Sequence, residues 1–336
     1  MLKQLELERK ATFCRELATL IGAGISLGMA LETLREQTAP GRLRMAAIEG
    51  TAKARGGRPW SEVMARYGDV FTPVETAMVR VGEESGHLDL ILAQIASYLE
   101  EEYRLRQMIS RETFYPKLVL ACIIAFPIVV PAIITGLTKT AGAGFAALMG
   151  GIFHLVLLAL VLIAAWAFFG HLLRSNRTFA TSWDLFKLNA PVFGLLVRRL
   201  ALARFSRGLA LMFGAGLPLP EALRLSADLT GSPAMREPMH AAALKLESGA
   251  GLAEVLSGVP YMDDMALQML RTGETTGSVD AMMMRVAEHF EEACETSIKR
   301  MVTMIMPISV IILGVFVLIM ALHVYGGILN QAAGIQ

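Results

Sequence analysis

The residues with the clearest potential for chemistry form a charged motif that occurs twice in the 336-residue chain. Both copies read Arg-x-Gly-Glu-x-[Ser/Thr]-Gly-x-[Leu/Val]-Asp. The fixed members are Arg80, Gly82, Glu83, Gly86 and Asp89 in the first copy and Arg271, Gly273, Glu274, Gly277 and Asp280 in the second. Catalysis by these carboxylates would need a His, Ser or Cys partner in register, and none is repeated. The motif therefore favours a structural turn, or a surface that contacts a partner, over a catalytic centre.

As a structural turn, the motif would join two helices. Ser85 or Thr276 could cap the helix that follows, and Asp89 or Asp280 would suit the positive end of that helix. The repeated arginine and glutamate could tie the turn together. A glycine in the motif would supply a backbone conformation that a Cβ disfavours.

Cofactor and metal chemistry are not indicated by the remaining residues. Residues 22–28 begin Gly-Ala-Gly but match neither GxGxxG nor GxxxxGK[ST], so they predict a tight turn between helices. Cys14, Cys122 and Cys294 are far apart, and the six histidines form no HExxH or HxxH pair. Only His154 lies well inside an apolar run, near an end where a neutral ring can reach water. We therefore predict no cofactor and no metal.

The charged motif is part of a larger internal duplication. Residues 13–31 and 205–223 are identical at ten of nineteen positions with an offset of 192, and residues 78–89 and 269–280 match at six of twelve with an offset of 191. A repeat of this kind indicates one structural unit that is present twice.

Within each copy the apolar residues follow a helical period. Leu88, Ile91, Leu92, Ile95 and Leu99 fall on one stripe in the first copy, and Val279, Met283, Val286 and Phe290 do so in the second. Gly, Pro and Ser interrupt the copies at short intervals. We therefore predict an all-α protein with two bundles of about six helices each, in which the last helix of each bundle continues into a membrane.

The composition is typical of a membrane protein, with 54% hydrophobic residues, 18% charged residues and a mean hydropathy of +0.51. Three charge-free runs are long enough for a helix to cross about 30 Å of hydrocarbon. No cleaved signal peptide is expected at the N-terminus. The predicted segments are a helical bundle at 1–116, a span at 117–138, a loop at 139–144, a span at 145–171, a second bundle at 172–301, a span at 302–325 and a tail at 326–336.

The orientation follows from the cations, which stay on the cytoplasmic side of a membrane protein. Fifteen of the 31 Lys and Arg residues fall in 1–116, fourteen fall in 172–301, Lys117 borders the first span, and only Lys139 remains outside. Both bundles and the N-terminus are therefore predicted to be cytoplasmic, with the C-terminus outside. The formal net charge of +1 gives no basic excess for binding nucleic acid.

The two Phe-x-Arg-x-Leu-Ala-x-x-x-Gly-Ala-Gly segments, the Gly-Leu-Pro-Leu-Pro-Glu-Ala-Leu of the second copy and the Gly-Glu-x-x-Gly-x-x-Asp turns carry a family resemblance. The sequence resembles the F-type inner-membrane platform proteins of type II secretion systems and type IV pili, the GspF/PilC family, from about Phe13 to Tyr325. Many members have several tens more residues before the first copy. The twelve residues before Phe13 resemble the shorter pilus-biogenesis members and favour a pilus system.

The resemblance implies a non-enzymatic platform in the bacterial inner membrane, with its C-terminus in the periplasm. Implied partners are a cytoplasmic hexameric assembly ATPase, pilin or pseudopilin subunits and other inner-membrane assembly proteins, and a homo-oligomer is expected. A small oligomeric transporter or intramembrane enzyme is the alternative. It is disfavoured because the predicted spans number only three and contain no Asp, Glu, Lys or Arg apart from Lys117 at the edge of the first span.

Two prolines mark where the final helix of each bundle is expected to meet the membrane. Pro116 and Pro307 are separated by the repeat offset of 191. A proline removes one backbone hydrogen bond and permits a bend, so these positions are candidate junctions of a lever that links each bundle to its span.

Overall fold

The computed structural model describes residues 2–112 and 193–333, together with isolated positions between 114 and 189. Every element in these residues is a helix, which confirms the all-α prediction. The chain divides into two units. The first is Met1–Met108 with Thr181–Glu295, and the second is Ile109–Ala180 with Thr296–Gln336. Both copies of the duplication therefore contribute to the first unit.

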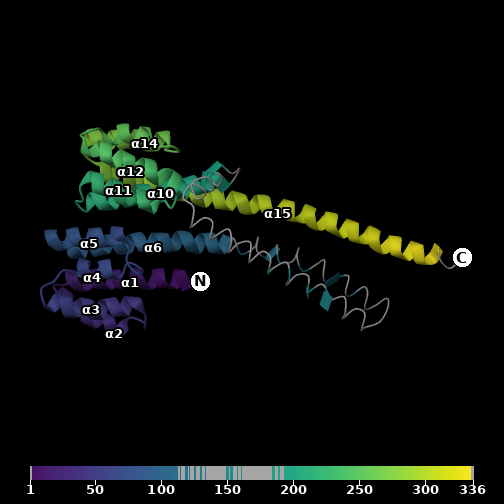
Figure 1. Cartoon of the computed structure of the whole chain (residues 1–336), viewed down its shortest axis with the longest axis horizontal. Helices are drawn as coiled ribbons and strands as arrows, with labels where there is room; N and C mark the ends of the chain where they lie inside the picture. The colour runs from purple at the N-terminus through teal and green to yellow at the C-terminus, as the bar shows by residue number, and fades with distance from the viewer. Residues whose placement is uncertain are drawn as a thin grey trace. The chain divides into compact units, whose positions relative to one another are not determined.

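Each copy contains six described helices, in agreement with the sequence (Figure 1). The first copy consists of α1 (Leu2–Gly22), α2 (Leu27–Gln37), α3 (Arg42–Arg55), α4 (Trp60–Arg66), α5 (Pro73–Ser85) and α6 (Leu88–Glu112). The second consists of α10 (Phe193–Gly214), α11 (Leu219–Leu229), α12 (Pro233–Glu247), α13 (Leu252–Ser257), α14 (Asp264–Thr276) and α15 (Val279–Ala333). Helix α10 of the second copy thus corresponds to α1 of the first. The remaining helices correspond in the same order, and the last pair is α15 and α6.

The Gly-Ala-Gly segments form the predicted tight turns. Gly24 and Gly216 have φ angles of +86° and +96°, a left-handed conformation that favours glycine. The N–H of Ile25 donates to the carbonyl of Leu20 at 3.1 Å, which closes the end of α1. These turns reverse the chain so that α2 and α11 can pack beside the helices that precede them.

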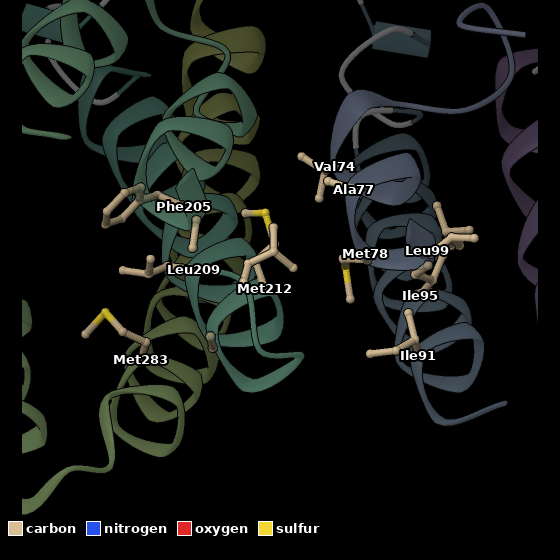
Figure 2. Close-up of a cluster of buried hydrophobic side chains, with 14 of the residues drawn as sticks. Val74, Ala77, Met78, Ile91, Ile95, Leu99, Phe205, Leu209, Met212 and Met283 are labelled. Carbon is tan, nitrogen blue, oxygen red and sulfur yellow. The ribbon is translucent and has the colours of Figure 1, made fainter. Parts of the chain in front are cut away.

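The predicted apolar stripes of α6 and α15 are buried (Figure 2). Ile91, Ile95 and Leu99 of α6 are at most 5% exposed, and Met283 of α15 is fully buried. Burial of one large apolar side chain stabilises a fold by about 1.5–3 kcal/mol, so each stripe holds its long helix firmly against its own bundle.

Trp60 is the largest fully buried side chain of the first copy and explains one glycine of α3. A Cβ at Gly50 would lie 2.1 Å from Cζ3 of Trp60, which is closer than any real contact. Glycine at this position lets α3 approach the indole ring of α4, and a larger residue would overpack the core.

Among the helices of the described residues, none combines the length and the apolar character that a membrane span requires. The predicted spans at 117–138 and 145–171, the loop at 139–144 and Pro116 lie outside the described residues, apart from isolated positions in the spans. The predicted span at 302–325 falls within α15, which runs through Pro307 without interruption.

Candidate functional site

The glutamates of the repeated motif cap a different helix of their own bundle. The Glu83 carboxylate accepts hydrogen bonds from the backbone N–H of Trp60, and from the N–H and hydroxyl of Ser61 at 3.2 and 2.6 Å. In the second copy, Glu274 accepts from the N–H groups of the first two residues of α13, Leu252 and Ala253. Each carboxylate thus satisfies donors that a helix N-terminus leaves unpaired, and its charge suits the positive end of the helix dipole.

The glycines of the motif hold the turn and the close approach of two helices. Gly86 and Gly277 end α5 and α14 with φ angles of +76° and +72°. A Cβ at Gly82 would lie 3.0 Å from Cγ1 of Ile91, and a Cβ at Gly273 would lie 2.9 Å from the Cα of the first residue of α15. The sequence correctly assigned these turns to glycine's conformational freedom, and the structure adds the requirement for space.

The acidic ends of the motif lie where the sequence placed them, whereas its hydroxyl residues do not. Asp89 and Asp280 occupy the first turns of α6 and α15. The prediction that Ser85 or Thr276 caps the next helix is wrong. Both hydroxyls donate backward within their own helices, to the carbonyls of Gly82 at 3.5 Å and of Thr272 at 2.8 Å. Each falls one residue before the glycine at which its helix ends, too early in the chain to be the N-cap of the following helix.

The arginines of the motif behave differently in the two copies. Arg80 forms an ion pair across the two copies, with 3.0 Å between its Nη2 and Oε1 of Glu221 in the first turn of α11. Arg271 is exposed and forms no ion pair within the part of the chain that the structure describes. The two copies of the motif therefore share the same turn geometry, but their arginines differ in the ion pairs that they form.

One ion pair is repeated in both copies and ties the first helix of each copy to the last. Arg15 of α1 binds Glu100 of α6 at 2.7 Å, and Arg207 of α10 binds Glu291 of α15 at 2.5 Å. Burial raises the pKa of Glu291, and the neighbouring Arg207 opposes that rise. Neither Glu100 nor Glu291 was predicted from the sequence, although the two recur at the same offset of 191 as the charged motif.

Glu102 of α6 joins the two copies through two arginines. It accepts from Nε and Nη2 of Arg204 on α10 at 3.1 and 2.8 Å, and from Nε of Arg106 at 2.8 Å. Its side chain is only 9% exposed, so the bidentate arginine compensates a carboxylate that has lost most of its water. This set is not repeated, and no sequence pattern indicated it.

The described cysteines are poor nucleophiles. Burial raises the pKa of both the Cys14 and the Cys294 thiol to about 12, so both groups are neutral near pH 7. Among the described residues, no three His, Cys, Asp or Glu side chains are placed to hold a metal ion. His154 and Cys122 lie outside these residues. The polar side chains described here form helix caps and ion pairs between helices.

Comparison with known proteins agrees with the two-copy architecture. The family model described as "Type II secretion system (T2SS), protein F" matches residues 13–136 and again 205–326. Each match begins at the Phe-x-Arg of a first helix and includes one charged turn. The chain belongs to this family.

Individual members of the T2SS protein F family cover nearly the whole chain. A "Type IV pilus assembly protein PilC" of Thermus thermophilus is 33% identical over 91% of this chain and 78% of its own length. A protein of the same name from Myxococcus xanthus is 26% identical over 96% of this chain and 80% of its own. A "Type II secretion system protein F" of Pseudomonas aeruginosa is 29% identical over 96% and 83%. The relatives thus include both pilus and secretion proteins.

The motif geometry makes a prediction about stability in this family member. Gly277→Val should destabilise the chain by about 1–3 kcal/mol, because it forces a β-branched residue into a left-handed conformation. Glu274→Gln should have a smaller effect, because its single amide oxygen can keep one of the two hydrogen bonds from the N–H groups of α13. The thermal unfolding midpoint of each purified variant measures the difference. A glutamine variant that unfolds at the wild-type temperature but assembles no pili would show that Glu274 contacts a partner instead.

Proposed function

We propose that this chain is a non-enzymatic platform that couples a cytoplasmic hexameric assembly ATPase to the insertion of pilin or pseudopilin subunits. The observation that carries the proposal is the double match to the T2SS protein F family over both helical copies. The names of the relatives from Thermus and Pseudomonas give the two settings, pilus assembly and type II secretion. Other inner-membrane assembly proteins and further copies of this chain complete the proposed assembly.

The proposed topology is a multi-pass protein of the bacterial inner membrane. Bundles at 1–116 and 172–301 lie in the cytoplasm, helices at 117–138, 145–171 and 302–325 cross the membrane, and the loop at 139–144 and the tail at 326–336 face the periplasm. The cation distribution supports this orientation, since 30 of the 31 Lys and Arg residues are on or beside the cytoplasmic parts. Val310, Ile311 and Leu318 of α15 are 59–65% exposed, which suits an apolar surrounding.

The charged turns are proposed first as structural caps and second as a partner surface. Glu83 and Glu274 are engaged with α4 and α13, so they are poorly available to a partner. Arg271 remains accessible for one. No cofactor enters the proposed role, because its work is to move protein subunits and the energy comes from the ATPase.

Reconstitution of the full chain in liposomes tests the proposed function. Added assembly ATPase from the same organism should bind these liposomes and not liposomes without the chain. Solute flux or substrate turnover by the chain without ATPase would contradict a platform and favour a transporter or an enzyme. Failure to recruit any assembly ATPase would contradict the coupling.

Reporter fusions test the proposed topology. Alkaline phosphatase fused after Gln336 should be active, because the enzyme folds only outside the cytoplasm, and a fusion at Ser182 should be inactive. The reverse activities at the two positions would overturn the three-span arrangement.

A further inference from the structure

The contact between the two copies joins unlike surfaces. Helix α5 of the first copy packs against α10 and α11 of the second. Ala77 and Met78 of α5 are buried, and Figure 2 shows Met78 on the side that faces Met212 of α10. The ion pair between Arg80 and Glu221 lies at this contact. The fifth helix of one copy thus binds the first two helices of the other.

The same two surfaces exist a second time in the chain. The second copy has its own fifth helix, α14, and the first copy has its own first two helices, α1 and α2. The offsets of 191 and 192 place Arg271 at the position of Arg80 and Met29 at the position of Glu221. Arg271 is exposed and forms no ion pair in the described ranges, and Met29 is 61% exposed. The face of α14 that carries Arg271 and the face of α1 and α2 that carries Met29 are therefore both exposed, although their counterparts on α5 and on α10 and α11 are in contact.

We propose that α14 of one chain binds the α1–α2 face, the side of α1 and α2 that carries Met29, on a second copy of this chain. The contact continues the one already present within each chain, so it is heterologous and can add chains in a ring or an open row. It rests on the homo-oligomer of the proposed function.

The direction of the final helices supports a repeated contact. Within the first unit, α6 and α15 run in the same direction (Figure 1). The rotation and translation that superpose the first copy on the second therefore keep the direction of the final helix. If the same rotation and translation relate one chain to the next, every chain keeps that direction too. All final helices of the assembly would then enter one membrane from the same side. A two-fold contact between the α1–α2 faces of two chains would not ensure that their final helices point in the same direction.

The residue exchanges between the copies fit a surface that is exposed in the free chain. Ala77 and Val81 of α5 correspond to Gln268 and Thr272 of α14, which keep the open face soluble. Met269 retains the apolar character of its counterpart Met78. The contact between chains should therefore be weaker and more easily reversed than the contact within a chain.

Cross-linking in membranes tests which faces meet. Chains with Met29→Cys and chains with Arg271→Cys are expressed separately and together, and each sample is treated with a short bis-maleimide. Cross-linked dimers should increase at least tenfold when both chains are present. Dimers from the Met29→Cys chain alone would show a two-fold contact and overturn the proposal. A chain with Arg80→Cys and Glu221→Cys must link internally, which controls for reach, and the unmodified chain controls for its native cysteines.

A charge exchange gives a second measurement on the full chain in detergent. Met29→Glu restores the carboxylate found at position 221, so it should pair with Arg271 of the neighbouring chain and tighten self-association by about twofold to fivefold at low salt. Arg271→Ala in the same chain should remove the gain. Weaker self-association of Met29→Glu, or no dimer in the mixed cross-linking sample, contradicts the proposed contact. Neither readout uses an ATPase or pili, so failure of the platform role would leave both results interpretable.

Discussion

Lys10→Met is expected to destabilise the folded chain by about 3–5 kcal/mol, because it leaves a buried carboxylate without its cation. The Lys10 ammonium lies 2.8 and 2.9 Å from the two carboxylate oxygens of Glu75 and also donates to the carbonyl of Val70 at 2.9 Å. The side chains of Lys10 and Glu75 are only 10% and 2% exposed, so the Glu75 carboxylate has little contact with solvent. A loss of this size is a large fraction of the roughly 5–15 kcal/mol by which folded domains are stable.

The chain itself offers the matched control for Lys10→Met. The corresponding positions of the second copy are Leu202 and Ala266, both buried, so the same fold forms there without an ion pair. The double variant Lys10→Leu/Glu75→Ala should recover most of the stability. It should lose mainly two hydrogen bonds to the backbone, from the Lys10 ammonium to the Val70 carbonyl and from the Thr72 N–H to Glu75. Thermal unfolding of the full chain and its level in the membrane measure both variants. Equal losses in the single and double variants would show that the pair itself stabilises the fold.

The fold was predictable because burial follows helical periodicity. Leu92 and Val286 could be placed in the core from spacing alone, and both are at most 1% exposed. Gly86 and Gly277 were also predictable, because a glycine at the same place in two copies of a helix-ending turn indicates a backbone requirement. The apolar spacing is a local signal that can be recognised within one copy, whereas the glycine signal also uses the comparison of the two copies.

The polar partners were not predictable, because their contacts are distant in sequence. Glu83 binds the start of α4, which lies more than twenty residues earlier in the chain, and no residue near Glu83 indicates that helix as its partner. The Arg207–Glu291 pair could have been found, since its equivalent recurs in the first copy at the repeat offsets. The Glu102–Arg204 pair could not, because it occurs once and depends on how the copies pack.

The two copies also differ in which charged residues pair within a bundle and which pair between the bundles. Lys10 and Glu75 of the first copy pair with each other inside its bundle, whereas Glu102 and Arg80 of the same copy pair with residues of the second. Ion pairs across a contact add specificity more than strength, because desolvation offsets much of their attraction. The apolar face of α5 therefore provides the stability of the contact and these pairs fix its register.

The final helices α6 and α15 each belong to both units. The boundary between the two units falls inside both helices, after Met108 in α6 and after Glu295 in α15. Helix α15 continues unbroken through Pro307 over 55 residues, which corresponds to about 80 Å. A continuous helix transmits bending and rotation along its axis, so we propose that motion imposed by the ATPase passes through these helices to the membrane, with Pro116 and Pro307 as junctions.

Inserting two glycines after Arg111 or after Arg300 is expected to stop pilus assembly while the membrane level and ATPase binding of the chain stay normal. Each glycine costs a helix interior about 1 kcal/mol relative to alanine and softens it locally. The matched pair replaces Lys299 and Arg300 by two glycines or by two alanines. Both variants lose the same side chains, and only the glycine variant loses stiffness, so only that variant should lose pili. Normal assembly with both insertions present would show that force does not travel through α6 and α15.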